Sequence, residues 1–217
     1  MNKNKIFVAC DGTNISRVRE IIDKTQNPKL KVGYKFGLEF LNSKEGRNFI
    51  SKLKNKVTFG DYKFADIPNT SSSAIKAVKD LKFNYLTIHI SSGYEALKAA
   101  KKVSGKTKLV GVTILTSLDN KALREIGFNK DVKKLVLDQA KLARKAKLDA
   151  IVCSGKEVNI VKKIFKKEII TPGIRFNSIT NDQKRVLTPK QAFKNGSHWL
   201  VIGRPITKGN INKNIKK

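Results

Sequence analysis

Cysteine, proline, aromatic residues and acidic residues are all scarce in this chain of 217 residues. The two cysteines, Cys10 and Cys153, each lie inside an apolar run. We therefore expect reduced, buried thiols and a cytoplasmic protein, not a disulfide scaffold. No His/Cys cluster has the spacing of a metal site, because His89 and His198 lie far apart. No signal-type segment leads the chain, and no run approaches the roughly 20 apolar residues of a membrane span.

The shortage of acidic residues leaves the chain strongly basic, with 46 Lys and Arg against 17 Asp and Glu and a formal net charge of +29. The electrostatic field of so positive a chain attracts polyanions, so a basic nucleic-acid-binding domain is one alternative. The lysines are scattered over exposed helical positions such as Lys76, Lys79 and Lys82, with no zinc module, recognition helix or aromatic stacking motif. A Lys- and Asn-rich coat on the solvent faces explains the charge better, and nucleic acid is not the expected partner.

Linkers rich in Pro, Gly or Ser are absent, and we expect one domain over residues 1–217. Short apolar runs alternate with amphipathic segments along the whole chain. The predicted strands cover residues 6–10, 30–33, 85–90, 109–115, 150–153, 169–174 and 199–203, with one more starting at residue 57. The predicted helices cover residues 15–22, 45–53, 71–81, 94–103, 132–146, 157–165 and 189–194.

Strands that alternate with helices in this way predict an α/β protein with a parallel (β/α)8 TIM barrel. A doubly wound open sheet is the alternative, but residues 10–13 after the first strand lack the G-x-G-x-x-G turn of nucleotide-binding sheets. The segment 208–217 is short and polar, so we expect a rudimentary last helix with a frayed end.

Charges of alternating sign follow one another at the end of the third predicted strand: Asp61, Lys63 and Asp66. Side chains alternate faces along a strand, so Asp61 and Lys63 point the same way, whereas Asp66 falls beyond the strand. Such charges are costly to bury unless they are paired. The segment is therefore a candidate site, and an ordinary ion pair on a solvated loop is the alternative.

In a barrel of this kind, chemistry takes place at the carboxyl ends of the strands, and phosphate often binds after the seventh and eighth. The residues that the sequence places there are Asp11, Lys31, Asp61, Lys63, Thr116, Arg175, Gly203 and Arg204. Lys31 lies within its predicted strand, so we expect it to project inward and not to stand beyond the end of the strand. Arginine forks and a backbone N–H suit a phosphoester. The polar loop 176–188 is expected to close over it with Gln183 as a lid residue, although a disordered surface loop is the alternative.

Residues 61–70, DYKFADIPNT, closely resemble the D-x-K-x-x-D-I-P-N-T signature of bacterial-type orotidine 5′-phosphate decarboxylases. Further segments match in order over most of the chain: 30–33, 112–117, 171–175, 182–185 and 201–205. The D-x-K-x-x-D core is shared with sugar-phosphate decarboxylases of the same superfamily. A magnesium-dependent enzyme of that kind is therefore the competing interpretation, but the whole set of segments is much more specific.

The resemblance implies a homodimeric barrel that converts orotidine 5′-monophosphate to UMP and CO2, the last step of de novo UMP biosynthesis, without metal or organic cofactor. It implies that Lys63 protonates C6 of the pyrimidine, that Asp61 faces the substrate carboxylate and that Lys31 holds the charge array. The residues implied to reach into the partner subunit's site are Asp66, Ile67 and Thr70.

Substrate contacts are also implied by the resemblance. Asp11 would bind the ribose region and Thr116 the pyrimidine. The residues implied to hold the phosphate are Arg175, Gln183, Gly203 and Arg204, and Gln183 would also link the lid to the base. The chain departs from the family pattern in its strongly basic charge and in its short C-terminal segment, which we expect to leave part of the barrel wall thinly covered.

Overall fold

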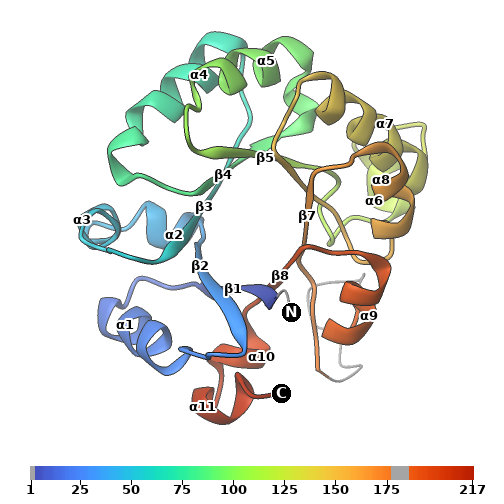
Figure 1. The fold of residues 1–217 in the computed structure, drawn as a ribbon. Coiled ribbons are helices and arrows are strands. Elements are labelled where there is room, and N and C mark those ends of the chain that lie inside the picture. The colour runs from blue at the N-terminus through green and yellow to red at the C-terminus, as the bar shows by residue number, and fades with distance from the viewer. Residues whose placement is uncertain (1–2, 177–185) are drawn as a thin grey trace.

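The structure is a computed structural model that describes residues 3–176 and 186–217. Within this part of the chain, eight parallel strands pair in sequence order, and β8 closes the ring against β1 (Figure 1). The predicted (β/α)8 barrel is therefore confirmed. The strands are β1 (Asn4–Cys10), β2 (Leu30–Phe36), β3 (Val57–Phe64), β4 (Tyr85–His89), β5 (Lys108–Val112), β6 (Ala150–Val152), β7 (Glu168–Thr171) and β8 (Trp199–Ile202).

Helices surround the barrel in Figure 1, and the longer ones lie where the sequence predicts them. They are α1 (Ile15–Lys24), α2 (Leu38–Leu41), α3 (Gly46–Ser51), α4 (Pro68–Ala77), η1 (Lys79–Leu81), η2 (Ile90–Ser92), α5 (Tyr94–Val103), α6 (Asn120–Glu125), α7 (Val132–Lys145), α8 (Val158–Ile164), α9 (Pro189–Asn195), α10 (Arg204–Thr207) and α11 (Ile211–Asn214). The last helix has only 4 residues, as expected for the polar C-terminal segment. Among the described residues, no helix is long and apolar enough to cross a membrane.

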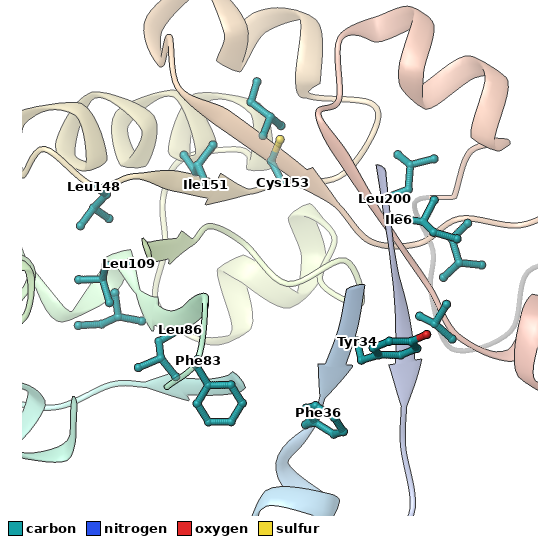
Figure 2. Close-up of a cluster of buried hydrophobic side chains, with 14 of the residues drawn as sticks. Ile6, Tyr34, Phe36, Phe83, Leu86, Leu109, Leu148, Ile151, Cys153 and Leu200 are labelled. Carbon is teal, nitrogen blue, oxygen red and sulfur yellow. The ribbon is translucent and has the colours of Figure 1, made fainter. Parts of the chain in front are cut away.

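Strand alternation divides the core into two layers. Side chains that point outward pack against the helices, and Figure 2 shows part of this layer, including Leu86, Leu109, Ile151 and Leu200. The inward layer fills the amino-terminal half of the barrel: Phe7, Phe59, Tyr85, Val110, Ala150, Ile170 and Trp199. At its centre the Phe7 and Trp199 rings stack with centroids 4.1 Å apart. This apolar plug fills the barrel interior, so any site at the carboxyl ends of the strands lies directly above it.

Strand β2 extends to Phe36, beyond the predicted end at Gly33. Val32, Tyr34 and Phe36 pack in the outward layer. Gly33 alternates with them and lies against the barrel interior, where a Cβ would come within 2.7 Å of the Phe7 ring. By the same alternation, the inward position at the carboxyl end of this strand belongs to residue 35.

Candidate active site

A cavity of about 490 Å³ opens at the carboxyl ends of the strands, above the apolar plug. This volume lies within the range of about 300–1,000 Å³ that is usual for small-molecule sites. Its charged residues come from both halves of the barrel: Asp11, Lys35, Asp61, Lys63, Arg175 and Arg204. The cavity therefore combines a mixed-charge region at the carboxyl ends of β1–β3 with two arginines after β7 and β8.

Alternating charges form a row on the β1–β3 side of the cavity. The Lys63 Nζ donates a hydrogen bond of 2.9 Å to Asp61 Oδ2. The Lys35 Nζ lies 3.4 Å from the same carboxylate oxygen and 3.4 Å from Asp11 Oδ1. We call Asp11, Lys35, Asp61 and Lys63 the charge array. Each ammonium contacts a carboxylate, so the array can be held in a fixed geometry before any ligand enters.

The two middle residues of the array, Lys35 and Asp61, are largely buried, so their charges need partners. The side chains of Lys35 and Asp61 are only 12% and 13% exposed. Burial alone would raise the pKa of Asp61, but the adjacent Lys35 and Lys63 ammonium groups outweigh it and hold that pKa below its ordinary value. Burial alone would lower the pKa of Lys35, but the charges of Asp61 and Asp11 outweigh it and raise that pKa. Both groups are therefore ionised at neutral pH.

The backbone is irregular at the end of β3, in the stretch that carries Asp61 and Lys63. Its register with β4 shifts between Gly60 and Phe64. Within this stretch Lys63 has a φ of +52°, a left-handed conformation that is uncommon outside glycine. Such a conformation costs about 1–3 kcal/mol and persists where the surroundings hold it. The Lys63 amide is held by a hydrogen bond of 2.7 Å to the Thr87 hydroxyl of β4.

The other side of the cavity, after β5 to β8, is largely apolar, with two arginines among its lining residues. Val112, Ile114, Thr116 and Val152 line it. Arg175 and Arg204 line it after β7 and β8, with Gly203 beside Arg204. Guanidinium groups and a backbone N–H at one end of a cavity suit a bound phosphate.

The backbone after β7 also pairs with the described residues that follow the segment 177–185. The Arg175 amide donates to Leu187 O at 3.0 Å, and the Leu187 amide donates to Gly173 O at 3.2 Å. Gly173 has a φ of +75°, which favours glycine over any residue with a side chain. The predicted lid residue Gln183 lies outside the described residues, so its role remains a prediction.

The prediction that Lys31 belongs to the charge array is wrong, because the structure places this side chain elsewhere. Lys31 is exposed near the amino end of β2 and does not line the cavity. Lys35 lies four residues further along, about 13 Å at strand spacing, and contacts both acids. The error arose from ending the strand at Gly33. The apolar alternation of Val32, Tyr34 and Phe36 was the signal that could have extended it.

Asp66, Ile67 and Thr70 are exposed and do not line the cavity of their own chain. The Asp66 carboxylate accepts a hydrogen bond of 2.7 Å from the Ile67 amide, and the Ile67 side chain is 66% exposed. In contrast, Asp11, Asp61, Lys63, Thr116, Arg175, Gly203 and Arg204 all lie around the cavity, as the sequence predicts. Their individual roles, and the shared site between subunits, stay predictions.

Comparison with known proteins gives the same family that the motifs indicate. A model of the Orotidine 5′-phosphate decarboxylase / HUMPS family matches residues 4–214. The chain is 42% identical over 214 residues to an orotidine 5′-phosphate decarboxylase of Wolbachia sp. subsp. Brugia malayi, covering 95% of this chain and 93% of the relative. It is 46% identical over 180 residues to the Ehrlichia chaffeensis enzyme of the same name, covering 80% of this chain and 78% of that one.

A solved structure agrees with these relatives. The crystal structure of orotidine 5′-phosphate decarboxylase from Lactobacillus acidophilus superposes with a TM-score of 0.83 at 31% identity, covering 99% of this chain and 96% of that chain. The barrel, the cavity at its carboxyl end and the family motifs therefore agree with one another. This chain belongs to the orotidine 5′-phosphate decarboxylase / HUMPS family.

Proposed function

We propose that this protein decarboxylates orotidine 5′-monophosphate to UMP and CO2, the last step of de novo UMP biosynthesis, in the cytoplasm. The observation that carries the proposal is the contact between Lys63 and Asp61 at one end of the charge array, inside a cavity that Arg175 and Arg204 also line. The relatives at 42% and 46% identity are orotidine 5′-phosphate decarboxylases, which supports this substrate over a keto-sugar phosphate.

Loss of CO2 from C6 leaves an electron pair in the plane of the pyrimidine ring, with no conjugated group to accept it. The stabilisation must therefore be electrostatic and stronger in the transition state than in the bound substrate. The Lys63 ammonium lies beside C6 in this proposal. It attracts the developing carbanion and then transfers a proton to C6, which gives UMP and leaves a neutral amine that is reprotonated from water.

Asp61 faces the substrate carboxylate in the same proposal. At about 4 Å and an effective dielectric constant near 20, two like charges repel by about 4 kcal/mol. The repulsion fades as neutral CO2 leaves. Enzymes supply roughly 8–23 kcal/mol in total, so this repulsion alone cannot suffice. The rest comes from Lys63 and from the rigidity of an array that Lys35 braces through Asp61 and Asp11.

The remaining contacts orient the substrate. Arg175, Gly203 and Arg204 bind the phosphate, with Gln183 joining them from the segment 176–188. Thr116 contacts the pyrimidine, and Asp11 contacts the ribose region while it also pairs with Lys35. Binding energy from the phosphate, which does not react, is then available to hold C6 against Lys63.

The working unit in this proposal is a homodimer. Asp66, Ile67 and Thr70 lie at the start of α4, exposed and outside their own cavity. Their exposure supports a role in the partner subunit's site, where Asp66 would add a second carboxylate next to Lys63. Ile67 is 66% exposed next to Asp66, and in this proposal the partner subunit covers it.

The test is the loss of orotate absorbance when the protein is added to orotidine 5′-monophosphate in the presence of a chelator. We expect turnover by the native protein and none by Lys63→Ala, whose circular dichroism stays native. Turnover of a keto-sugar phosphate that Mg²⁺ stimulates, without turnover of orotidine 5′-monophosphate, would instead identify a sugar-phosphate decarboxylase. Full activity of Lys63→Ala would remove the proposed role of Lys63.

A further inference from the structure

We propose that Thr87 is a positioning residue for this reaction: its hydroxyl fixes the Asp61 carboxylate and the Lys63 backbone relative to each other. The inference rests on the proposed function, because it concerns how the charge array is held in its working geometry. Thr87 lies on β4 and does not line the cavity, so it acts through its neighbours and touches no ligand.

The Thr87 hydroxyl links two residues at the irregular end of β3, Asp61 and Lys63. It accepts a hydrogen bond of 2.7 Å from the Lys63 amide and donates one of 3.1 Å to Asp61 Oδ1. Asp61 Oδ2, the other oxygen of that carboxylate, is the atom that Lys35 and Lys63 contact. Thr87 thus holds one oxygen of Asp61 and leaves the other to the two ammonium groups.

The irregular register of β3 explains why a side chain is needed here. Gly60 pairs with Leu86 and Phe64 with Ile88, so three residues of β3, 61–63, face the single residue Thr87 of β4. A regular ladder cannot satisfy the backbone groups of such a bulge. The Thr87 hydroxyl supplies the acceptor for the Lys63 amide, which carries the left-handed φ of +52°. It replaces a missing backbone acceptor at the residue that carries the proton donor.

The burial of Thr87 helps to fix the direction of its hydroxyl proton. Thr87 is fully buried, with an exposure of 0%. The amide already occupies one acceptor direction of the hydroxyl, so its single proton is directed at Asp61. A hydroxyl that accepts from one group and donates to another is polarised by both, which strengthens each hydrogen bond. A valine would fill nearly the same space but would leave both the amide and the carboxylate oxygen without this partner.

The experiment compares Thr87→Val, which removes the hydroxyl, with Thr87→Ser, which keeps it. We expect Thr87→Val to lower kcat about tenfold to a hundredfold, as a displacement of reacting groups by about 1 Å does. KM should stay within about threefold, because the phosphate contacts are intact. Thr87→Ser should recover most of the loss. The matched control is Thr25→Val, another threonine of 0% exposure, whose hydroxyl bonds Ile21 O at the end of α1; its kcat should not change.

Amide hydrogen exchange at Lys63 gives a readout that needs no substrate. We expect faster exchange of this amide in Thr87→Val than in the native protein and in Thr87→Ser, since its acceptor is lost. If Thr87→Val does not fold, Thr87→Cys, a weak donor and acceptor of similar volume, must show the same loss of kcat.

Native kcat in Thr87→Val, or equal losses in Thr87→Val and Thr25→Val, would overturn the inference and leave the proposed function standing. A native protein that does not consume orotidine 5′-monophosphate would overturn the proposed function. In that case unchanged exchange at Lys63 would still count separately against the positioning of its backbone by Thr87.

Discussion

The Lys35 ammonium lies 3.4 Å from the Asp61 carboxylate, across the boundary between β2 and β3. Both side chains are almost buried, and each would be costly in that place without the other. Lys35 also reaches Asp11 after β1, so it is the residue that ties three strands into one array. Its contacts give the first prediction.

Lys35→Ala and Lys31→Ala form a matched pair on the same strand. We expect Lys35→Ala to lower kcat by about a hundredfold or more, because a fixed cation next to the reacting groups is lost. Lys31→Ala should retain native kcat, since this side chain is exposed at the far end of β2. Steady-state kinetics on orotidine 5′-monophosphate measure both. Similar losses in the two variants would contradict the placement of Lys35 in the array and of Lys31 outside it.

Asp61→Asn should make the free energy of unfolding depend less on pH in the acid range. The folded pKa of Asp61 lies below its ordinary value, so its ionised form stabilises the fold above about pH 4 and this contribution is lost as pH falls through the folded pKa. We expect the variant to be about 3 kcal/mol less stable at pH 7, because two ammonium groups lose a buried partner. Urea unfolding from pH 7 to pH 3 measures the difference, which should shrink on the acid side. A difference that is constant over this range would argue against the ionised pair.

Mixing two inactive variants tests the shared site. Asp66→Asn and Lys63→Ala should each be inactive alone, but a heterodimer contains one site with both native residues. Random exchange of subunits should therefore restore about a quarter of native activity. Co-expression with two different tags isolates the heterodimer. An inactive, properly isolated heterodimer would place Asp66 outside the partner's site.

Arg204→Ala should weaken substrate capture. A lost hydrogen bond to a charged group is worth about 1.5–3 kcal/mol, which corresponds to a fall in kcat/KM of about tenfold to more than a hundredfold. Arg144→Ala is the control, because Arg144 is exposed on the last turn of α7 and does not line the cavity. Inorganic phosphate should inhibit the native enzyme more strongly than Arg204→Ala. Equal kinetics of the two variants would remove Arg204 from the phosphate site.

Local pattern was enough to predict the barrel. Apolar runs that alternate with amphipathic segments specify strands and helices by short-range periodicity, and their order leaves few topologies. The same logic placed Asp61 and Lys63 on one face, because they lie two residues apart on one strand. It left the direction of Asp66 open, because this residue falls beyond the strand, where alternation no longer applies.

Which side chains contact Asp61 and Lys63 depends on distances across the barrel. Which lysine reaches Asp61 is set by where β2 ends and by its register with β3, and the sequence interpretation ended that strand at Gly33 and selected Lys31. Thr87 became significant only because the bulge in β3 brings three residues opposite it. By itself the sequence determined the elements, their order and the motif, since these follow from neighbours in the chain. Only the tertiary structure decided which charges meet, because hydrogen bonds and ion pairs require contact within a few ångströms between residues that are distant in sequence.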